Sequence, residues 1–188
     1  MSPQEIARFS DAAVMSAAVV FTLAMLSHIG EWAAGRGARR EPDLAPDLVG
    51  ATLTATAVRS ETRIELLGRI GVALTVVGFG LNLVGLLARG LAAGRVPWGN
   101  MYEFAIASAV GVVGVYLLML RRHRLRWLGL PVTTLVVVVL MLSVLLLQVP
   151  AGPLVPALQT YWLYIHVSAA IIATGAFTVG ALACLAVL

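Results

Sequence analysis

The stretch that decides the fold runs from Arg121 to Val149 and reads RRHRLRWLGLPVTTLVVVVLMLSVLLLQV. Four of its first six residues are arginines, and no charged residue follows from Trp127 to Val149. An α-helix rises about 1.5 Å per residue, so roughly 20 apolar residues cross the ~30 Å hydrocarbon core of a bilayer. The uncharged part is long enough for one crossing. The stretch therefore predicts a transmembrane helix preceded by an arginine-rich loop.

Four more runs of similar length and apolar composition occur in the chain. We therefore expect an all-α fold, a polytopic bundle of about five transmembrane helices that forms a single domain. The second run contains four glycines and Asn82. Small residues at such spacing let a neighbouring helix approach closely. The expected spans are approximately residues 12–30, 68–88, 102–120, 127–149 and 161–188.

The composition favours a membrane protein and argues against a soluble one. Hydrophobic residues make up 60% of the 188 residues and charged residues 12%, whereas soluble domains carry roughly 25% charged residues to face water. The net charge of +4 comes from 13 arginines and no lysine, and the arginines cluster between the apolar runs. Loops of this kind contact the headgroups of a lipid bilayer, so we expect no nucleic-acid partner.

The arginines also predict an orientation, because short arginine-rich loops stay in the cytoplasm. Most of the arginines follow the first and third spans, so we expect a polar cytoplasmic loop over residues 33–63 and a cytoplasmic Arg121–Arg126 segment. The connections 89–100 and 150–160 then lie outside, together with the N-terminus. We expect a multi-pass protein of the cell membrane whose functional face is extracytoplasmic.

Cys184 is the only cysteine, and it lies within the last apolar run. A single cysteine excludes an internal disulfide, a CxxC redox pair and a thiolate metal cluster. Any thiol chemistry in which the protein takes part must therefore be supplied by a partner.

His166 is the first candidate for chemistry and lies in the segment YWLYIHV, which begins at Tyr161. Aromatic residues concentrate at the membrane–water interface, so this segment predicts an imidazole at the outer edge of the bilayer. Neutral imidazole dominates at pH 7 and can ligate iron. The alternative is an interfacial histidine bonded to a carbonyl or a headgroup, and the pattern leaves both open.

The other two histidines lie near the predicted cytoplasmic side. His28 precedes Glu31 and Trp32 by one helical turn, so the three share a helix face. A His–Glu pair can relay protons or hold a cofactor, but a snorkelling pair at the inner interface is the favoured interpretation. His123 lies inside Arg-Arg-His-Arg, a pattern typical of solvated headgroup contact. We assign it no chemistry.

A second concentration of special residues reads PWGNMYEF, from Pro97 to Phe104. Its proline breaks a helix, and its Gly-Asn pair permits a turn. Its aromatic side chains offer flat apolar surfaces at the outer face. An aromatic belt at a helix start accounts for these rings, but not for Glu103 inside the membrane boundary. The aromatic residues are Trp98, Tyr102 and Phe104.

Two motifs in order give the sequence a family resemblance. RVPWGNMYEF, from Arg95 to Phe104, is followed by LQTYWLYIHV, from Leu158 to Val167. The pair resembles the CcsA/ResC family, often named CcsB in actinobacteria, the haem-handling membrane components of system II cytochrome c biogenesis. The resemblance covers most of the chain from about the second span onward.

The resemblance implies a protein that carries haem b, as a transported substrate, to the outer face of the membrane. A ResB-type membrane partner and a thiol-reducing thioredoxin-like protein would help to join the haem vinyl groups to the two cysteines of a CxxCH apocytochrome c. The position of His166 is, in that family, an external axial ligand of haem iron. We expect a haem or client site on the same side, bordered by Trp98, Tyr102 and Phe104, with Arg95 available to pair with a propionate and Glu103 as a further cofactor-binding residue.

The sequence also departs from the family, because a tryptophan-rich WWD motif and a second external histidine should follow the fifth span. We therefore expect the N-terminal part of a longer protein that belongs to a haem lyase (holocytochrome c synthase) complex and is inactive alone. Its catalytic residues stay unassigned. The alternatives are a polytopic transporter or permease subunit without haem, and a structural membrane anchor. The polar residues of the spans are too scattered for a transporter site.

Overall fold

A computed structural model describes residues 1–40, 52–123, 125–150, 152 and 160–187. Within these ranges the chain is helical and contains no β-strand. A short 3₁₀ turn, η2 (Arg126–Leu128), leads into α4, and a π-helical turn, η3 (Ser143–Leu147), follows it. The main helices are α1 (Pro3–Arg40), α2 (Thr52–Ala93), α3 (Met101–Arg122), α4 (Gly129–Leu142) and α5 (Tyr161–Val187).

Among the described residues, five helical segments are long and apolar enough to cross a membrane. The predicted all-α, polytopic fold is therefore confirmed in the described part of the chain. The fourth segment combines η2, α4 and η3 into one span. The segments of membrane-spanning length are Pro3–Arg36, Glu61–Ala93, Met101–Arg122, Arg126–Leu147 and Tyr161–Leu185.

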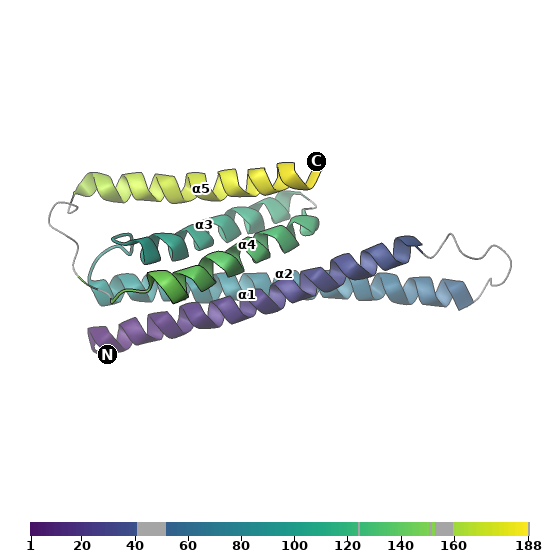
Figure 1. The fold of residues 1–188 in the computed structure, drawn as a ribbon, viewed down its shortest axis with the longest axis horizontal. Coiled ribbons are helices and arrows are strands. Elements are labelled where there is room, and N and C mark those ends of the chain that lie inside the picture. The colour runs from purple at the N-terminus through teal and green to yellow at the C-terminus, as the bar shows by residue number, and fades with distance from the viewer. Residues whose placement is uncertain (41–51, 124, 151, 153–159, 188) are drawn as a thin grey trace.

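The first two helices extend well beyond their apolar runs. In Figure 1, α1 and α2 lie side by side and reach past the ends of α3 and α4. Much of the segment 33–63, predicted as a polar loop, is helical, because α1 continues to Arg40 and α2 begins at Thr52. Alanine, arginine, leucine and glutamate are good helix formers in water, so the end of an apolar run need not end the helix. Residues 41–51 lie outside the described residues.

Successive helices run in opposite directions, so the connections between them lie alternately at the two ends of the bundle. The N-terminus, the turn between α2 and α3 and the start of α5 lie at one end, the N-terminal end (Figure 1). The end of α3 and η2 lie at the other, the arginine-rich end. The predicted orientation requires this alternation. Which end faces the cytoplasm stays a prediction.

A ladder of glycines joins α1 and α2. Three glycines of α2, seven residues apart, face three side chains of α1 that are also seven residues apart. A methyl group added at these glycines would lie 2.7–3.0 Å from the facing side-chain atoms, so the contact depends on their absence. Small residues at one face let transmembrane helices pack closely, as expected for this run. The pairs are Gly71 with His28, Gly78 with Phe21, and Gly85 with Val14.

The rest of the core lies among α1, α3 and α4, while α5 packs chiefly on α3. The two helices cross at Gly111 and Gly175, where a methyl group on Gly175 would lie 2.8 Å from the backbone carbonyl of Gly111. Much of the remaining surface of α5 is exposed. The largest fully buried apolar side chains of the core are Phe21, Tyr102, Ile106, Tyr116, Leu128 and Leu140.

Candidate functional site

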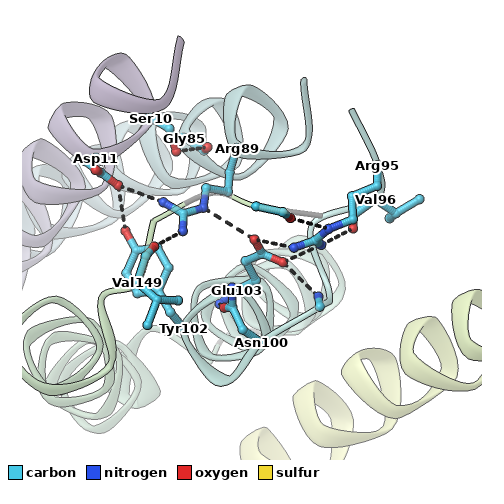
Figure 2. Close-up of polar contacts among 12 residues, drawn as sticks. Ser10, Asp11, Gly85, Arg89, Arg95, Val96, Asn100, Tyr102, Glu103 and Val149 are labelled. Atoms are coloured by element: carbon cyan, nitrogen blue, oxygen red, sulfur yellow. Dashed lines mark hydrogen bonds and ion pairs between the residues drawn. The ribbon is translucent and has the colours of Figure 1, made fainter. Parts of the chain in front are cut away.

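Buried charges gather at the N-terminal end of the bundle. Figure 2 shows two arginine guanidinium groups on either side of one carboxylate, with a second carboxylate beyond them. Arg89 and Glu103 have exposed fractions of 1% and 0%. Burial of this extent requires each charge to be paired. We call the five residues the charged cluster: Asp11 of α1, Arg89 of α2, Arg95 of the connecting turn, and Tyr102 and Glu103 of α3.

The end of α2 positions Arg95. Gly94 has a φ of +62°, the left-handed conformation that favours glycine. Its N–H donates to the carbonyl of Leu91 at 3.3 Å, and the Arg95 N–H donates to the carbonyl of Gly90 at 3.1 Å. These two bonds form a Schellman motif, which satisfies the last carbonyls of a helix and reverses the chain. Arg95 therefore starts the turn toward α3.

The start of α3 positions Glu103. Asn100 is the N-cap, and its side-chain oxygen accepts a hydrogen bond from the Glu103 N–H at 2.8 Å. The Glu103 carboxylate accepts in return from the Gly99 N–H at 2.8 Å. This exchange resembles a capping box, in which the side chain at N3 bends back over the helix start. The helix start thus directs the carboxylate toward the turn.

Glu103 and Arg95 form a two-pronged ion pair. Arg95 Nη1 lies 2.8 Å from Glu103 Oε2, and Nη2 lies 3.2 Å from Oε1. The same guanidinium donates to the carbonyls of Gly152 at 3.1 Å and Val96 at 3.0 Å. Such bidentate pairs are among the strongest charge-assisted hydrogen bonds. To pair with a propionate, as the sequence predicts, Arg95 would have to give up part of this network.

Arg89 of α2 makes polar contacts with α1, α3 and the chain after η3. Its Nε lies 3.4 Å from Glu103 Oε1, and its Nη1 lies 3.3 Å from Asp11 Oδ1. Its Nη2 donates to the carbonyl of Val149, beyond the end of η3. The guanidinium carbon lies 4.9 Å from the centre of the Tyr102 ring, and the Tyr102 hydroxyl donates to Asp11 at 3.4 Å. Two arginines thus balance two carboxylates, so the cluster as a whole is neutral.

The structure brings only part of the predicted site together. Arg95, Tyr102 and Glu103 meet in the charged cluster, and Trp98 is half-buried in the same turn, against the core. His166 is exposed near the start of α5. In the described ranges no three His, Cys, Asp or Glu side chains come close enough to hold a metal ion. The role of each residue toward haem stays a prediction.

Sequence reasoning missed Asp11 and Arg89. Each stands at the edge of an apolar run, Asp11 before Ala12 and Arg89 after Ala88, where a charge usually marks only the membrane boundary. Opposite charges at the same predicted end of two neighbouring spans were the available signal. Glu103, a charge inside the predicted membrane boundary, was a further sign that oppositely charged partners lie nearby.

A second polar group lies toward the arginine-rich end. His28 Nδ1 lies 3.3 Å from Glu31 Oε2, as their shared helix face predicts, and Glu31 Oε1 accepts from Arg126 at 3.1 Å. His28 is 1% exposed, with Gly71 and Gly129 against its ring. Its Nε2 has no hydrogen-bond partner within the described residues. A histidine so enclosed cannot snorkel to headgroups, so that interpretation of His28 is wrong.

These features define the class: a polytopic helical membrane protein whose buried charges are paired at one end of the bundle. Residues 98–188 match the family described as "Cytochrome C assembly protein". The chain belongs to the CcsA-type family of cytochrome c biogenesis proteins.

Three curated relatives are named "Cytochrome c biogenesis protein CcsA". The relative from Synechococcus sp. (strain JA-3-3Ab) is 35% identical over 144 residues, which cover 74% of this chain and 42% of the relative. The relative from Picosynechococcus sp. is 38% identical over 128 residues, 65% of the chain and 36% of the relative. The relative from Gloeobacter violaceus is 35% identical over 130 residues, which cover 67% of this chain and 38% of the relative. The matched residues thus cover 36–42% of the length of these relatives. No solved structure matches it significantly.

Proposed function

We propose that this chain takes part in cytochrome c biogenesis by presenting haem b, as a substrate, at the extracytoplasmic face of the membrane for attachment to apocytochrome c. The observation that carries the proposal is the exposed imidazole of His166, close to the start of α5 at the N-terminal end of the bundle. The matched segment 98–188 contains His166 and two members of the charged cluster, Tyr102 and Glu103. Relatives named for cytochrome c biogenesis favour this function over a transporter.

His166 supplies the chemistry in this proposal. A neutral imidazole nitrogen is a common axial ligand of haem iron. A planar porphyrin needs open space beside its ligand, and Tyr161, Trp162, Ile165 and His166 are all exposed on this part of α5. The exposed aromatic rings offer apolar contact to a macrocycle.

The charged cluster has a structural role in the same proposal. It joins α1, α2, α3 and the chain after η3 at the end of the bundle where His166 lies. Arg95 and Glu103 satisfy one another, so we assign them to holding this end together and not to direct contact with haem. A ResB-type membrane partner and a thiol-reducing thioredoxin-like protein would complete the apparatus, because Cys184 alone cannot reduce a CxxCH disulfide.

The test of the proposal is His166→Ala in the full-length protein. Alanine is a good helix former, so α5 should form and insert normally. Haem absorbance of the purified protein should fall at least about tenfold, and added imidazole should partly restore it by occupying the vacated coordination position. His123→Ala, an exposed histidine at the opposite end, is the matched control and should keep its haem. Unchanged haem and unchanged cytochrome c maturation in His166→Ala would leave His166 without a haem role.

The proposed orientation predicts opposite labelling of two exposed positions. In a Cys184→Ala background, Thr160→Cys before α5 and His123→Cys after α3 each place the one thiol of residues 1–188 at an exposed position. A membrane-impermeant maleimide should label Thr160→Cys in intact cells and His123→Cys only after permeabilisation, because arginine-rich loops stay inside. Labelling after solubilisation controls for reactivity. Labelling of His123→Cys in intact cells would reverse the orientation and place His166 on the cytoplasmic side.

A further inference from the structure

A cationic pocket opens at the arginine-rich end, on the side of the bundle formed by α2 and α3. It has a volume of about 780 Å³, and its polar lining consists of four arginines, His123 and one carboxylate. Two of the arginines have protein partners: Arg69 pairs with Glu65 at 2.6 Å, and Arg126 pairs with Glu31 at 3.1 Å. The pocket therefore carries more positive charge than the protein around it balances.

Arg121 and Arg122 supply the unbalanced charge. Both are exposed at the end of α3, and within the described residues neither makes a hydrogen bond or an ion pair. The negative end of the helix dipole stabilises a positive charge at this position, but the N–H donors of the guanidinium groups stay available for a ligand. Two neighbouring guanidinium groups suit a phosphate, which accepts charge-assisted hydrogen bonds from several donors.

An apolar groove continues from this pocket along the bundle. It has a volume of about 400 Å³ and shares Val72, Leu120 and Arg121 with the pocket. Its walls come from α2 and α3 and are almost wholly aliphatic or aromatic, with Val76, Phe79 and Leu118 among them. A cationic recess that opens into an apolar groove between two membrane-length helices fits a ligand with an anionic head and an apolar tail.

We propose that this surface binds one anionic phospholipid, with its phosphate on Arg121 and Arg122 and an acyl chain in the groove. The site lies where a helix leaves the apolar part of the membrane, the depth at which lipid phosphates occur, and basic pockets of this kind bind acidic headgroups. Haem is also an amphiphile with anionic groups, and the pocket offers its iron one exposed imidazole, His123, whereas the groove presents no His, Cys or Met. The inference does not rest on the proposed function.

The experiment measures lipid retention by native mass spectrometry of the detergent-purified protein. Phosphatidylglycerol should be retained at least about tenfold more than phosphatidylcholine, and the double variant Arg121→Gln, Arg122→Gln should lose that preference. Arg36→Gln is the matched control, because Arg36 is exposed on α1 near the same end, lies over the Trp32 ring and does not line the pocket. This control should behave as the wild type.

Four outcomes would overturn the proposal. Equal retention of the two lipids by the wild type would show that the charge of the headgroup does not govern binding. A preference that survives in the double variant would show that Arg121 and Arg122 do not bind the phosphate. Binding of inorganic phosphate as tight as that of phosphatidylglycerol would show that the groove does not bind an acyl chain. Displacement of phosphatidylglycerol by haem b, together with loss of haem binding in the same double variant, would assign the surface to haem instead.

Discussion

Glu103→Ala is expected to prevent most of the protein from accumulating in a folded state. The substitution leaves the buried guanidinium of Arg89 and the largely buried one of Arg95 without their shared carboxylate, and it removes the acceptor of the Gly99 N–H. Removing one partner of a buried pair costs about 3–5 kcal/mol. That is a large part of the roughly 5–15 kcal/mol by which folded proteins are stable. The measurement is the yield of monodisperse protein and its thermal midpoint in detergent.

Glu65→Ala is the matched control, because Glu65 also pairs with an arginine but in the open. The side chains of Arg69 and Glu65 are 73% and 56% exposed. Exposed pairs contribute less than about 1 kcal/mol, so this variant should melt close to the wild type. If Glu103→Ala melted as Glu65→Ala does, the charged cluster would not stabilise the bundle.

Gly175→Ala is expected to weaken the attachment of α5 to α3. The added methyl group would lie 2.8 Å from two backbone atoms of Gly111, and backbone cannot swing aside as a side chain can. The helices must separate locally, and overpacking of this kind costs about 1–3 kcal/mol. The measurement is the rate of proteolytic release of α5, together with the thermal midpoint.

Gly180→Ala tests the same change on the same helix without a neighbour. A methyl group there meets nothing within 4 Å, so the variant should be neutral or stabilised by up to about 1 kcal/mol through helix propensity. Equal behaviour of the two variants would mean that α5 is not held at Gly175. Because His166 lies on α5, loss of this contact should also lower haem retention in the full-length protein.

The presence of five helices of membrane-spanning length and apolar composition in the described residues was predictable, because it depends on local composition. An uncharged run such as 127–149 must cross the bilayer or hide its side chains, whatever surrounds it. The shared face of His28 and Glu31 was predictable for the same reason, since it follows from helical periodicity alone. The helix ends were less predictable, because α1 and α2 continue as helices beyond their apolar runs.

What the amino-acid sequence determined by itself was the helical membrane class, the number of spans and an unexplained Glu103 near a predicted helix start. Only the tertiary structure decided that Glu103 lies between Arg89 and Arg95, with Asp11 on the far side of Arg89. Asp11 and Arg89 are 78 residues apart in the chain, and no local pattern records which helices become neighbours. The physical reason is that hydrophobic length is a property of each segment, whereas the pairing of buried charges depends on how the segments pack.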